Sequence, residues 1–395
     1  MPPLWRASAR ALADRRTVAV GVAAAVVATS GVVAAVARET GAAGSAASLP
    51  AAAVAPLLPA PSPSGTPASP AVRAPLPTPS TVPSPARAAT LDPLPAPPAP
   101  PTGCPPPPRP PVKPVKPWRP SRVVAEADLP VALPPLSRSP SLDVLRGKGM
   151  WTYQWERTEA GSAAAVVRRA RAAGLTQIWV RTGSSRSGFY AAPELRALLP
   201  LAHAAGIAVV AWDFPYLYDP VADAGRAAET LAFTAPGGHR IDAFSPDIES
   251  GSEGTQGTVR RLSVYLGLVQ RAVGSRPLVS TVPHANSHWW RIYDYRTQVP
   301  YVDAFAVMAY WGCTEPGAEV QQSVRRLAPL GRPLHLIGQS YDMGPYGGRR
   351  GDPRGREVWR FADVSRRSGV IGVSLYVWQY ATDEQFRALG AYPWR

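Results

Sequence analysis

Residues 145–395 of this 395-residue chain predict a (β/α)8 barrel. Short apolar runs alternate there with amphipathic ones, which is the pattern of parallel strands joined by helical crossovers. Eight such units fit into about 250 residues, the usual size of this barrel. A doubly wound open sheet is the alternative. It is disfavoured because no Gly-rich phosphate loop follows the first apolar run, where a dinucleotide-binding sheet needs one.

The predicted elements alternate between strand and helix along the chain. The first strand is 148–155, and its helix, 159–174, ends at Gly174, where a helix C-terminus favours glycine. The other strands are predicted at 176–183, 207–216, 241–249, 277–283, 302–311, 333–342 and 369–380. The other helices are predicted at 193–206, 219–233 and 255–274, near 320–330, near 356–368 and from Asp383 onward.

The N-terminal part of the chain predicts an exported protein. Residues 1–16 are basic, whereas residues 17–37 carry no charge and predict a helix of roughly 31 Å, long enough to cross a bilayer. The arginines before this segment predict a cytoplasmic N-terminus and a membrane anchor with the rest of the chain outside the cell. The small residues 35–37 also fit a cleavage site, so a signal peptide and a secreted protein are the alternative.

Residues 38–144 predict a disordered linker rich in Pro and Ala. Of the 48 prolines in the chain, 27 lie between Pro50 and Pro120. Such a tract lacks large apolar side chains and many backbone donors, so we expect it to be extended and solvated. The two cysteines, Cys104 and Cys313, exclude a disulfide scaffold and a cysteine-ligated zinc module, and a bridge between them stays open.

The charge of the barrel segment argues against nucleic-acid binding. From Arg146 onward there are 29 basic and 21 acidic residues, a net charge of +8. These charges are spread along the helices, whereas nucleic-acid binding favours a basic stripe with interleaved aromatics. Such a surface suits an anionic cell envelope. We expect a monomer that contacts the membrane only through its N-terminal helix.

Two carboxylates end the fourth predicted strand, in the sequence IDAFSPDIE. Side chains alternate along a strand, so Ser245, Asp247 and Glu249 share one face, with Phe244 and Ile248 on the other. Two buried acids cost several kcal/mol unless they are paired, hydrogen-bonded or protonated. The C-terminal ends of barrel strands build the active site, which makes Glu249 and Asp247 the first catalytic candidates.

Further aromatic and polar residues are predicted at the same end of the barrel. Aromatic faces with a few directional polar groups suit a sugar ring, whose C–H face packs on an indole while its hydroxyls need hydrogen-bond partners. Tyr310 is the third catalytic candidate, beside Glu249 and Asp247. The substrate-binding candidates are Trp378, Trp212, Asp213, Met308, Gln339, Tyr153 and Arg181. Structural alternatives are a core role for Tyr310, a barrel plug for Trp378 and a turn for Asp213.

Cleavage of a glycosidic bond would use both acids. One carboxylic acid protonates the leaving oxygen, and a neighbouring carboxylate raises its pKa so that it stays protonated near neutral pH. Glu249, at the strand tip, is the candidate acid, and Asp247, one pleat deeper, would orient the substrate or stabilise charge. No metal or other cofactor is expected, because His284 and His288 are four apart in a loop and not on a helix.

The fourth strand resembles that of the family 18 glycoside hydrolases, the chitinase-like barrels, whose motif is Asp-x-Asp-x-Glu. Asp247 and Glu249 match its last two acids, whereas Ser245 stands where the first Asp would be. This departure weakens the charge relay that the family places behind its acid. Met308 and Tyr310 are similar to the Met-x-Tyr of the family's sixth strand.

The last predicted strand adds a further resemblance. Trp378 matches a Trp that the family keeps at the floor of the sugar site, while Trp311 stands where an Asp commonly follows the Tyr of the sixth strand. The Trp-Gln-Tyr sequence and the isolated Asp-x-Glu also look like the family 25 muramidases, related barrels that cut peptidoglycan. The resemblance covers the barrel, but its specific matches are three short segments.

The family 18 resemblance implies a substrate-assisted reaction on a 2-acetamido sugar. The acetamido oxygen of the substrate attacks the anomeric carbon, Glu249 protonates the leaving group, Asp247 steadies the acetamido nitrogen and Tyr310 hydrogen-bonds its carbonyl. This reaction needs no metal, and chitin-like chains and peptidoglycan both carry such sugars. Two rivals remain: a non-catalytic carbohydrate-binding barrel, and an enzyme on neutral sugars whose partner acid is Asp213 or Asp342.

Overall fold

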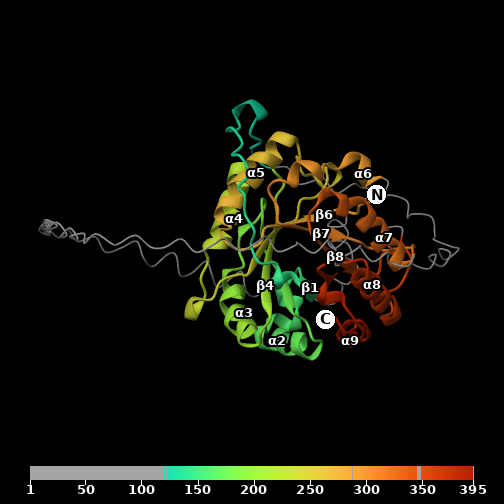
Figure 1. Cartoon of the computed structure of the whole chain (residues 1–395). Helices are drawn as coiled ribbons and strands as arrows, with labels where there is room; N and C mark the ends of the chain where they lie inside the picture. The colour runs from blue at the N-terminus through green and yellow to red at the C-terminus, as the bar shows by residue number, and fades with distance from the viewer. Residues whose placement is uncertain (1–119, 121, 287, 345–347, 395) are drawn as a thin grey trace, which may run out of the picture. The chain divides into compact units, whose positions relative to one another are not determined.

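The computed structural model describes residues 120, 122–286, 288–344 and 348–394, which form a ring of strands surrounded by helices (Figure 1). The barrel strands are β1 (Gly147–Thr152), β2 (Gln177–Ser184), β4 (Ala208–Phe214), β5 (Ala243–Pro246), β6 (Val279–Val282), β7 (Ala304–Met308), β8 (Leu334–Gln339) and β9 (Gly372–Tyr376). The helices that follow them are α2 (Ala163–Ala172), α3 (Ala192–Ala204), α4 (Pro220–Ala232), α5 (Val259–Ala272), α6 (Trp289–Ile292), α7 (Pro316–Leu327), α8 (Gly355–Arg367) and α9 (Asp383–Ala391).

Parallel pairing closes the strands into a barrel. The order around the sheet is β5-β4-β2-β1-β9-β8-β7-β6. Parallel bridges between Phe244 and Leu278 and between Asp247 and Thr281 then join β5 to β6. The predicted (β/α)8 architecture is therefore confirmed for the described part of the chain. Because all eight strands are parallel, their C-terminal ends meet at one mouth of the barrel.

Two short elements were not predicted from the sequence. A two-residue strand, β3 (Gly188–Phe189), pairs antiparallel with the end of β2. The four-residue helix α6 lies in the connection between β6 and β7. Both are too short for a hydrophobic period to form, which is why the sequence pattern does not indicate them.

Large and small side chains fill the interior of the barrel. Trp151 of β1 stacks on Trp179 of β2, with ring centroids 4.5 Å apart. Both are buried with small residues such as Ala243 and Ala304. The indole nitrogen of Trp151 donates to Oγ of Ser374 at 2.8 Å, which satisfies its polar edge. The interior is thus a packed core, and a ligand can bind only at the mouth.

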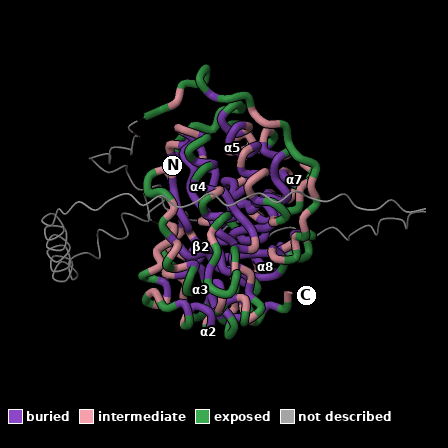
Figure 2. Tube along the Cα trace, turned by 90° about the vertical axis from the view of Figure 1, so that its left-hand side faces the viewer, coloured by how far each residue is buried: buried purple, intermediate pink, exposed green. Residues whose placement is uncertain are grey.

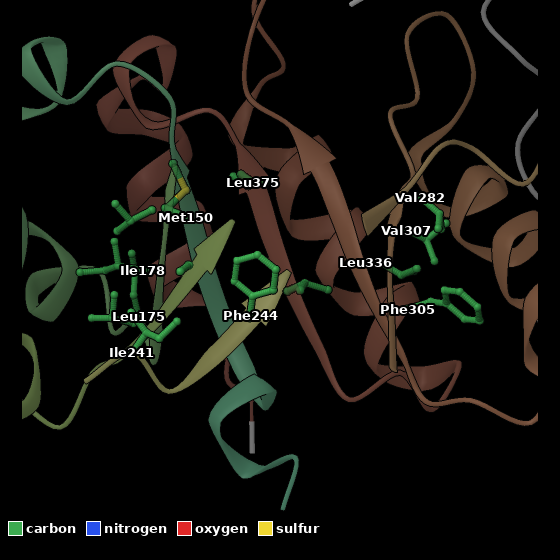
Figure 3. Packing of buried hydrophobic residues seen from close by; sticks show 14 of the residues in the cluster. Met150, Leu175, Ile178, Ile241, Phe244, Val282, Phe305, Val307, Leu336 and Leu375 are labelled. Atoms are coloured by element: carbon green, nitrogen blue, oxygen red, sulfur yellow. The ribbon is translucent and has the colours of Figure 1, made fainter. Parts of the chain in front are cut away.

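A second apolar layer lies between the strands and the helices. Met150, Ile178 and Phe244 belong to it (Figure 3), and buried residues lie inside the molecule while exposed ones follow its outer helices (Figure 2). Helix starts are fixed by side-chain caps, because Ser162 and Asp219 accept a backbone N–H at the first turns of α2 and α4. α4 begins one residue after its predicted start at 219, whereas α2 begins four residues after its predicted start at 159.

Residues 122–144 correct the predicted domain boundary. The sequence placed them in the disordered linker, but they run along the outside of α5 (Figure 1). Leu136 donates its backbone N–H to Oε1 of Gln270 at 2.7 Å, and Arg138 lies 3.1 Å from Asp303. The prediction was wrong because an extended segment has no hydrophobic period, and its partners are side chains far along the chain.

We expect a chain that starts at residue 145 to be less stable than one that starts at residue 120. The truncation removes, among others, four hydrogen bonds of Leu136, Arg138, Leu129 and Pro134 to the barrel. At about 0.5–1.5 kcal/mol each, their loss should lower the free energy of unfolding by about 2–6 kcal/mol. Chemical denaturation of both chains measures the difference. Identical midpoints and slopes would show that residues 122–144 contribute nothing to the folded unit.

The predicted anchor lies outside the described residues. The same holds for residues 1–16, for Cys104 and for most of the predicted linker. Within the described part of the chain, no helix combines the length and the apolar character needed to cross a membrane. The membrane anchor and the alternative signal peptide both stay predictions.

Candidate active site

β5 sends alternate side chains into the barrel, as its sequence predicts. Ala243 packs in the interior, and Oγ of Ser245 lies 2.7 Å from both the carbonyl of Val279 and Oγ1 of Thr281. Asp247 is the next inward residue and bridges to Thr281. Ser245 therefore ties β5 to β6 and leaves no second Asp behind the carboxylates.

Seven of the ten predicted site residues line one small cavity at the mouth of the barrel, here called the mouth cavity. Its volume is about 40 Å³. Its lining consists of Trp151, Tyr153, Arg181, Trp212, Phe214, Asp247, Glu249, Thr281, Met308, Tyr310, Ile337 and Tyr376. The predicted members are Glu249, Asp247, Tyr310, Trp212, Met308, Tyr153 and Arg181. Residues from all eight barrel strands and their ends thus meet at one point, as expected for a barrel active site.

Burial raises the pKa of both carboxyls. Asp247 is only 7% exposed, and burial raises its pKa to about 7, although the charge of Arg181 lowers it. The pKa of Glu249 is raised well above its usual range by burial and then by the charges of Asp247 and Glu253. Both carboxyls therefore keep their protons to a higher pH than free acids do.

One oxygen of this pair is unsatisfied. Among the described residues, Oδ1 of Asp247 has no hydrogen-bond partner although it is buried. A buried acceptor without a donor is costly, by roughly 1–3 kcal/mol. A ligand that brings an N–H or O–H to this position would recover that free energy.

Arg181 covers the aromatic side of the mouth cavity. Its guanidinium carbon lies 4.6 Å from the ring centre of Tyr153 and 5.3 Å from that of Trp212. Within the described residues Arg181 forms no ion pair, and its charge acts on Asp247 at longer range. A sugar ring can reach these two aromatic faces only beside the guanidinium or after it moves.

Tyr310 lies against other rings on the opposite side of the mouth cavity. Its ring centre is 5.3 Å from that of His284 and 6.3 Å from that of Tyr376. Burial raises the pKa of Tyr310 well above its usual range, so the phenol stays neutral and keeps its O–H for donation. Tyr310 can therefore donate to a ligand carbonyl in the mouth cavity.

Trp378 corrects a sequence prediction. It lies in a single turn after β9 and packs on Phe386 in the outer layer, with ring centres 5.1 Å apart. Its indole nitrogen donates to Oε1 of Glu159 at 2.9 Å. Because β9 ends at Tyr376 and the chain then turns outward, Tyr376 and not the predicted Trp378 lines the mouth cavity.

Asp213 and Gln339 also lie outside the mouth cavity. Asp213 points from β4 toward α4, where its Oδ2 accepts from Nε of Arg226 at 2.8 Å. Gln339 uses Oε1 to accept the backbone N–H of Gly312 at 2.9 Å, which ties β8 to the loop after β7. Both side chains therefore have structural partners, and their positions do not support the predicted substrate contacts.

Sequence reasoning missed several residues of the mouth cavity. The alternation of β9 could have indicated Tyr376, since Ser374 and Tyr376 are successive inward positions. The alternation of β6 could likewise have indicated Thr281. No sequence signal distinguishes the other missed residues from ordinary core, namely Trp151, Phe214 and Ile337.

No protein-family model and no curated protein sequence matches this chain. Solved structures that it resembles include the chitinase from Chromobacterium violaceum ATCC 12472, at 14% identity and a TM-score of 0.48, covering 62% of this chain and 98% of that one. They also include the Bacillus cereus spore cortex-lytic enzyme SleL, at 12% identity, a TM-score of 0.46 and coverages of 62% and 73%. Another is the β-galactosidase from the psychrophilic Marinomonas ef1, at 10% identity, a TM-score of 0.47 and coverages of 62% and 58%. All three similarities are low, and they identify no family for this chain.

Proposed function

We propose that this protein is a glycoside hydrolase that cleaves an N-acetylated glycan, chitin-like or peptidoglycan. One observation carries the proposal: Asp247 and Glu249 enter the same aromatic mouth cavity from the end of β5, and burial raises the pKa of both. A carboxylic acid that keeps its proton near neutral pH beside a carboxylate is what the protonation of a glycosidic oxygen requires.

The proposed reaction uses groups that lie around the mouth cavity. The acetamido oxygen of the substrate attacks the anomeric carbon while the glycosidic C–O bond breaks, and Glu249 transfers its proton to the departing oxygen. Oδ1 of Asp247, which has no partner among the described residues, accepts the acetamido N–H. Tyr310 donates to the acetamido oxygen. Water then attacks the anomeric carbon while the bond from that carbon to the acetamido oxygen breaks, and the Glu249 carboxylate takes a proton from the water.

We also propose that the barrel works outside the cytoplasm. The basic residues 1–16 and the uncharged residues 17–37 support a membrane anchor, or a signal peptide if the segment is removed. A glycan of the envelope is then within reach of a barrel on a Pro-rich spacer.

A non-catalytic carbohydrate-binding barrel is the second candidate. The mouth cavity, at about 40 Å³, has room for little more than one water molecule. A sugar ring can enter it only if side chains such as Arg181 and Tyr153 move apart. Ser245 also leaves the carboxylate pair without the further Asp that a relay would use.

Release of reducing ends from chitin oligomers and peptidoglycan tests the proposal. The full-length chain is expected to release them in proportion to time and enzyme concentration. Saturable binding of the same glycans without any release would favour the binding barrel instead. Neither binding nor release would exclude both candidates for these glycans.

A further inference from the structure

A second, much larger cavity adjoins Glu249 and has no role in the reaction described above. This side cavity has a volume of about 840 Å³. Its walls are the loop between β5 and α5 and the segment around α6. The lining residues are Ile248, Glu249, Ser250, Gly251, Ser252, Thr255, Gln256, Gly257, Thr258, Leu262, Asn286, His288, Trp289, Ile292, Tyr293 and Asp294.

Glu249 is the only residue that lines both cavities within the described part of the chain. The mouth cavity holds about 40 Å³, whereas the side cavity lies within the range of about 300–1,000 Å³ typical of cavities for drug-sized ligands. If Glu249 is the general acid, the reacting sugar lies on its mouth-cavity side and the departing oxygen lies on its side-cavity side. The space on the far side of Glu249 is therefore where the leaving part of the substrate can lie.

We propose that the side cavity binds the leaving part of the glycan, so that the protein acts on chains with more than one sugar beyond the cleaved bond. The proposal rests on the proposed glycoside hydrolase function. When the C–O bond breaks, the departing oxygen gains the Glu249 proton and leaves as a sugar hydroxyl in the side cavity.

Trp289 is held where it can serve as a stacking surface for a sugar. Oδ1 of Asn286 accepts the backbone N–H groups of His288 and Trp289, each at 3.1 Å, which fixes the start of α6. The flat, apolar indole ring of a Trp packs well against the C–H face of a sugar ring. Because Trp289 is only partly buried, its ring stays accessible from the side cavity.

Tyr293 fixes the opposite end of α6 to the catalytic strand. Its hydroxyl donates to the carbonyl of Ile248 at 2.6 Å and accepts from Nε2 of Gln298 at 2.9 Å. The residue directly before Glu249 is therefore tied to the wall of the side cavity. A sugar that packs on this wall is held in a defined position relative to the proton donor.

The charge of the side cavity narrows the class of ligand. The described lining residues include the acids Glu249 and Asp294 but no Lys or Arg. A carboxylate-bearing sugar would face the Asp294 carboxylate with no lining Lys or Arg to offset it, whereas an N-acetylated or amine-bearing sugar would meet no such repulsion. The leaving part is therefore a neutral or partly deacetylated amino-sugar chain.

Two variants with opposite changes of volume test the inference. Trp289→Ala removes the stacking surface, and Gly257→Phe fills the side cavity at a position where an added Cβ meets nothing within 4 Å. Trp359→Ala, at a 43% exposed Trp on α8, is the matched control. The substrates are the N-acetylglucosamine hexamer and the glycosyl fluoride of its dimer, whose leaving atom is too small to use the side cavity.

The readout is the ratio of kcat/KM for the hexamer to kcat/KM for the fluoride. We expect this ratio to fall at least tenfold in both cavity variants and to stay within twofold of the native value in Trp359→Ala. An unchanged ratio in both cavity variants would overturn the inference, because the leaving part would then lie elsewhere.

Binding separates failure of this inference from failure of the proposed function. If the native chain turns over neither substrate, the hydrolase proposal fails. Titration of the hexamer then decides on the side cavity itself. A tenfold loss of affinity in Gly257→Phe would keep the side cavity as a glycan site, and unchanged affinity would exclude it.

Discussion

Replacement of Glu249 by glutamine is expected to lower kcat for an N-acetylated glycan by about 10²–10⁴-fold. The amide keeps the shape of the side chain but has no acidic proton to give to the departing oxygen. Affinity for the glycan should stay within a few fold, since glutamine retains polar contacts to both cavities. Initial rates of reducing-end release and a binding titration measure the two quantities on the same preparations.

A substrate that needs no protonation sharpens this test. Fluoride leaves without a proton, so the glycosyl fluoride should lose much less rate than the hexamer in Glu249→Gln. Glu156→Gln is the matched control, because Glu156 follows β1 at the same end of the barrel but is exposed and lines neither cavity. Equal losses on both substrates would show that Glu249 does not act as the proton donor.

The rival acids for an enzyme on neutral sugars do not reach the mouth cavity. Asp213 faces α4 and pairs with Arg226. Oδ1 of Asp342 accepts the backbone N–H groups of Gly344 and Gly351, at 2.7 Å and 2.9 Å, within the loop after β8. In the described part of the chain, Asp247 is therefore the acid that accompanies Glu249 at the mouth.

The fold was predictable because the spacing of apolar residues along the chain indicates its strands and helices. Strands and helices of this barrel are long enough to show their alternation, and the inward face of β5 follows directly from counting by two. The same counting identifies Ser245, Asp247 and Glu249 as neighbours. Both predictions depend only on the geometry of residues that are close together in the sequence, so the sequence alone is sufficient for them.

The errors arise where strands end and where extended segments dock. Trp378 was placed at the mouth because the last strand was predicted to reach residue 380 and because it matches a family Trp, but β9 stops at Tyr376 and the chain then turns outward. Residues 122–144 have a linker composition, and only the side chains of α5 and its neighbours give them a defined path. The partners in both cases are distant in sequence, so local patterns cannot predict them.

Replacement of Asp247 by asparagine is expected to stabilise the folded protein while it impairs catalysis. Burial raises the pKa of Asp247 from 3.8 to about 7 in the folded state. The stability that belongs to the protonated acid is therefore fully present below pH 3.8 and is lost as the pH rises through about 7. Asparagine resembles the protonated acid and does not titrate, so it avoids this loss.

The gain in stability of Asp247→Asn over the native protein should therefore depend on pH. At pH 8 the variant is expected to be more stable than the native protein by up to about 4 kcal/mol, since the pKa of Asp247 rises from 3.8 to about 7 and each unit of pKa shift corresponds to about 1.4 kcal/mol. At pH 4 the difference should vanish. Denaturant unfolding at both pH values measures it, with the exposed Glu156→Gln as a control that should follow the native protein at both.

The same substitution should move the pH profile of any remaining activity. The charge of Asp247 raises the pKa of Glu249, so its removal lowers that pKa, and the alkaline limb of kcat/KM should shift to lower pH. A stabilising change that costs activity marks a residue kept for function and not for the fold. If Asp247→Asn destabilised the protein equally at pH 4 and pH 8, Asp247 would instead be an ionised group with a structural partner, and its proposed role would be lost.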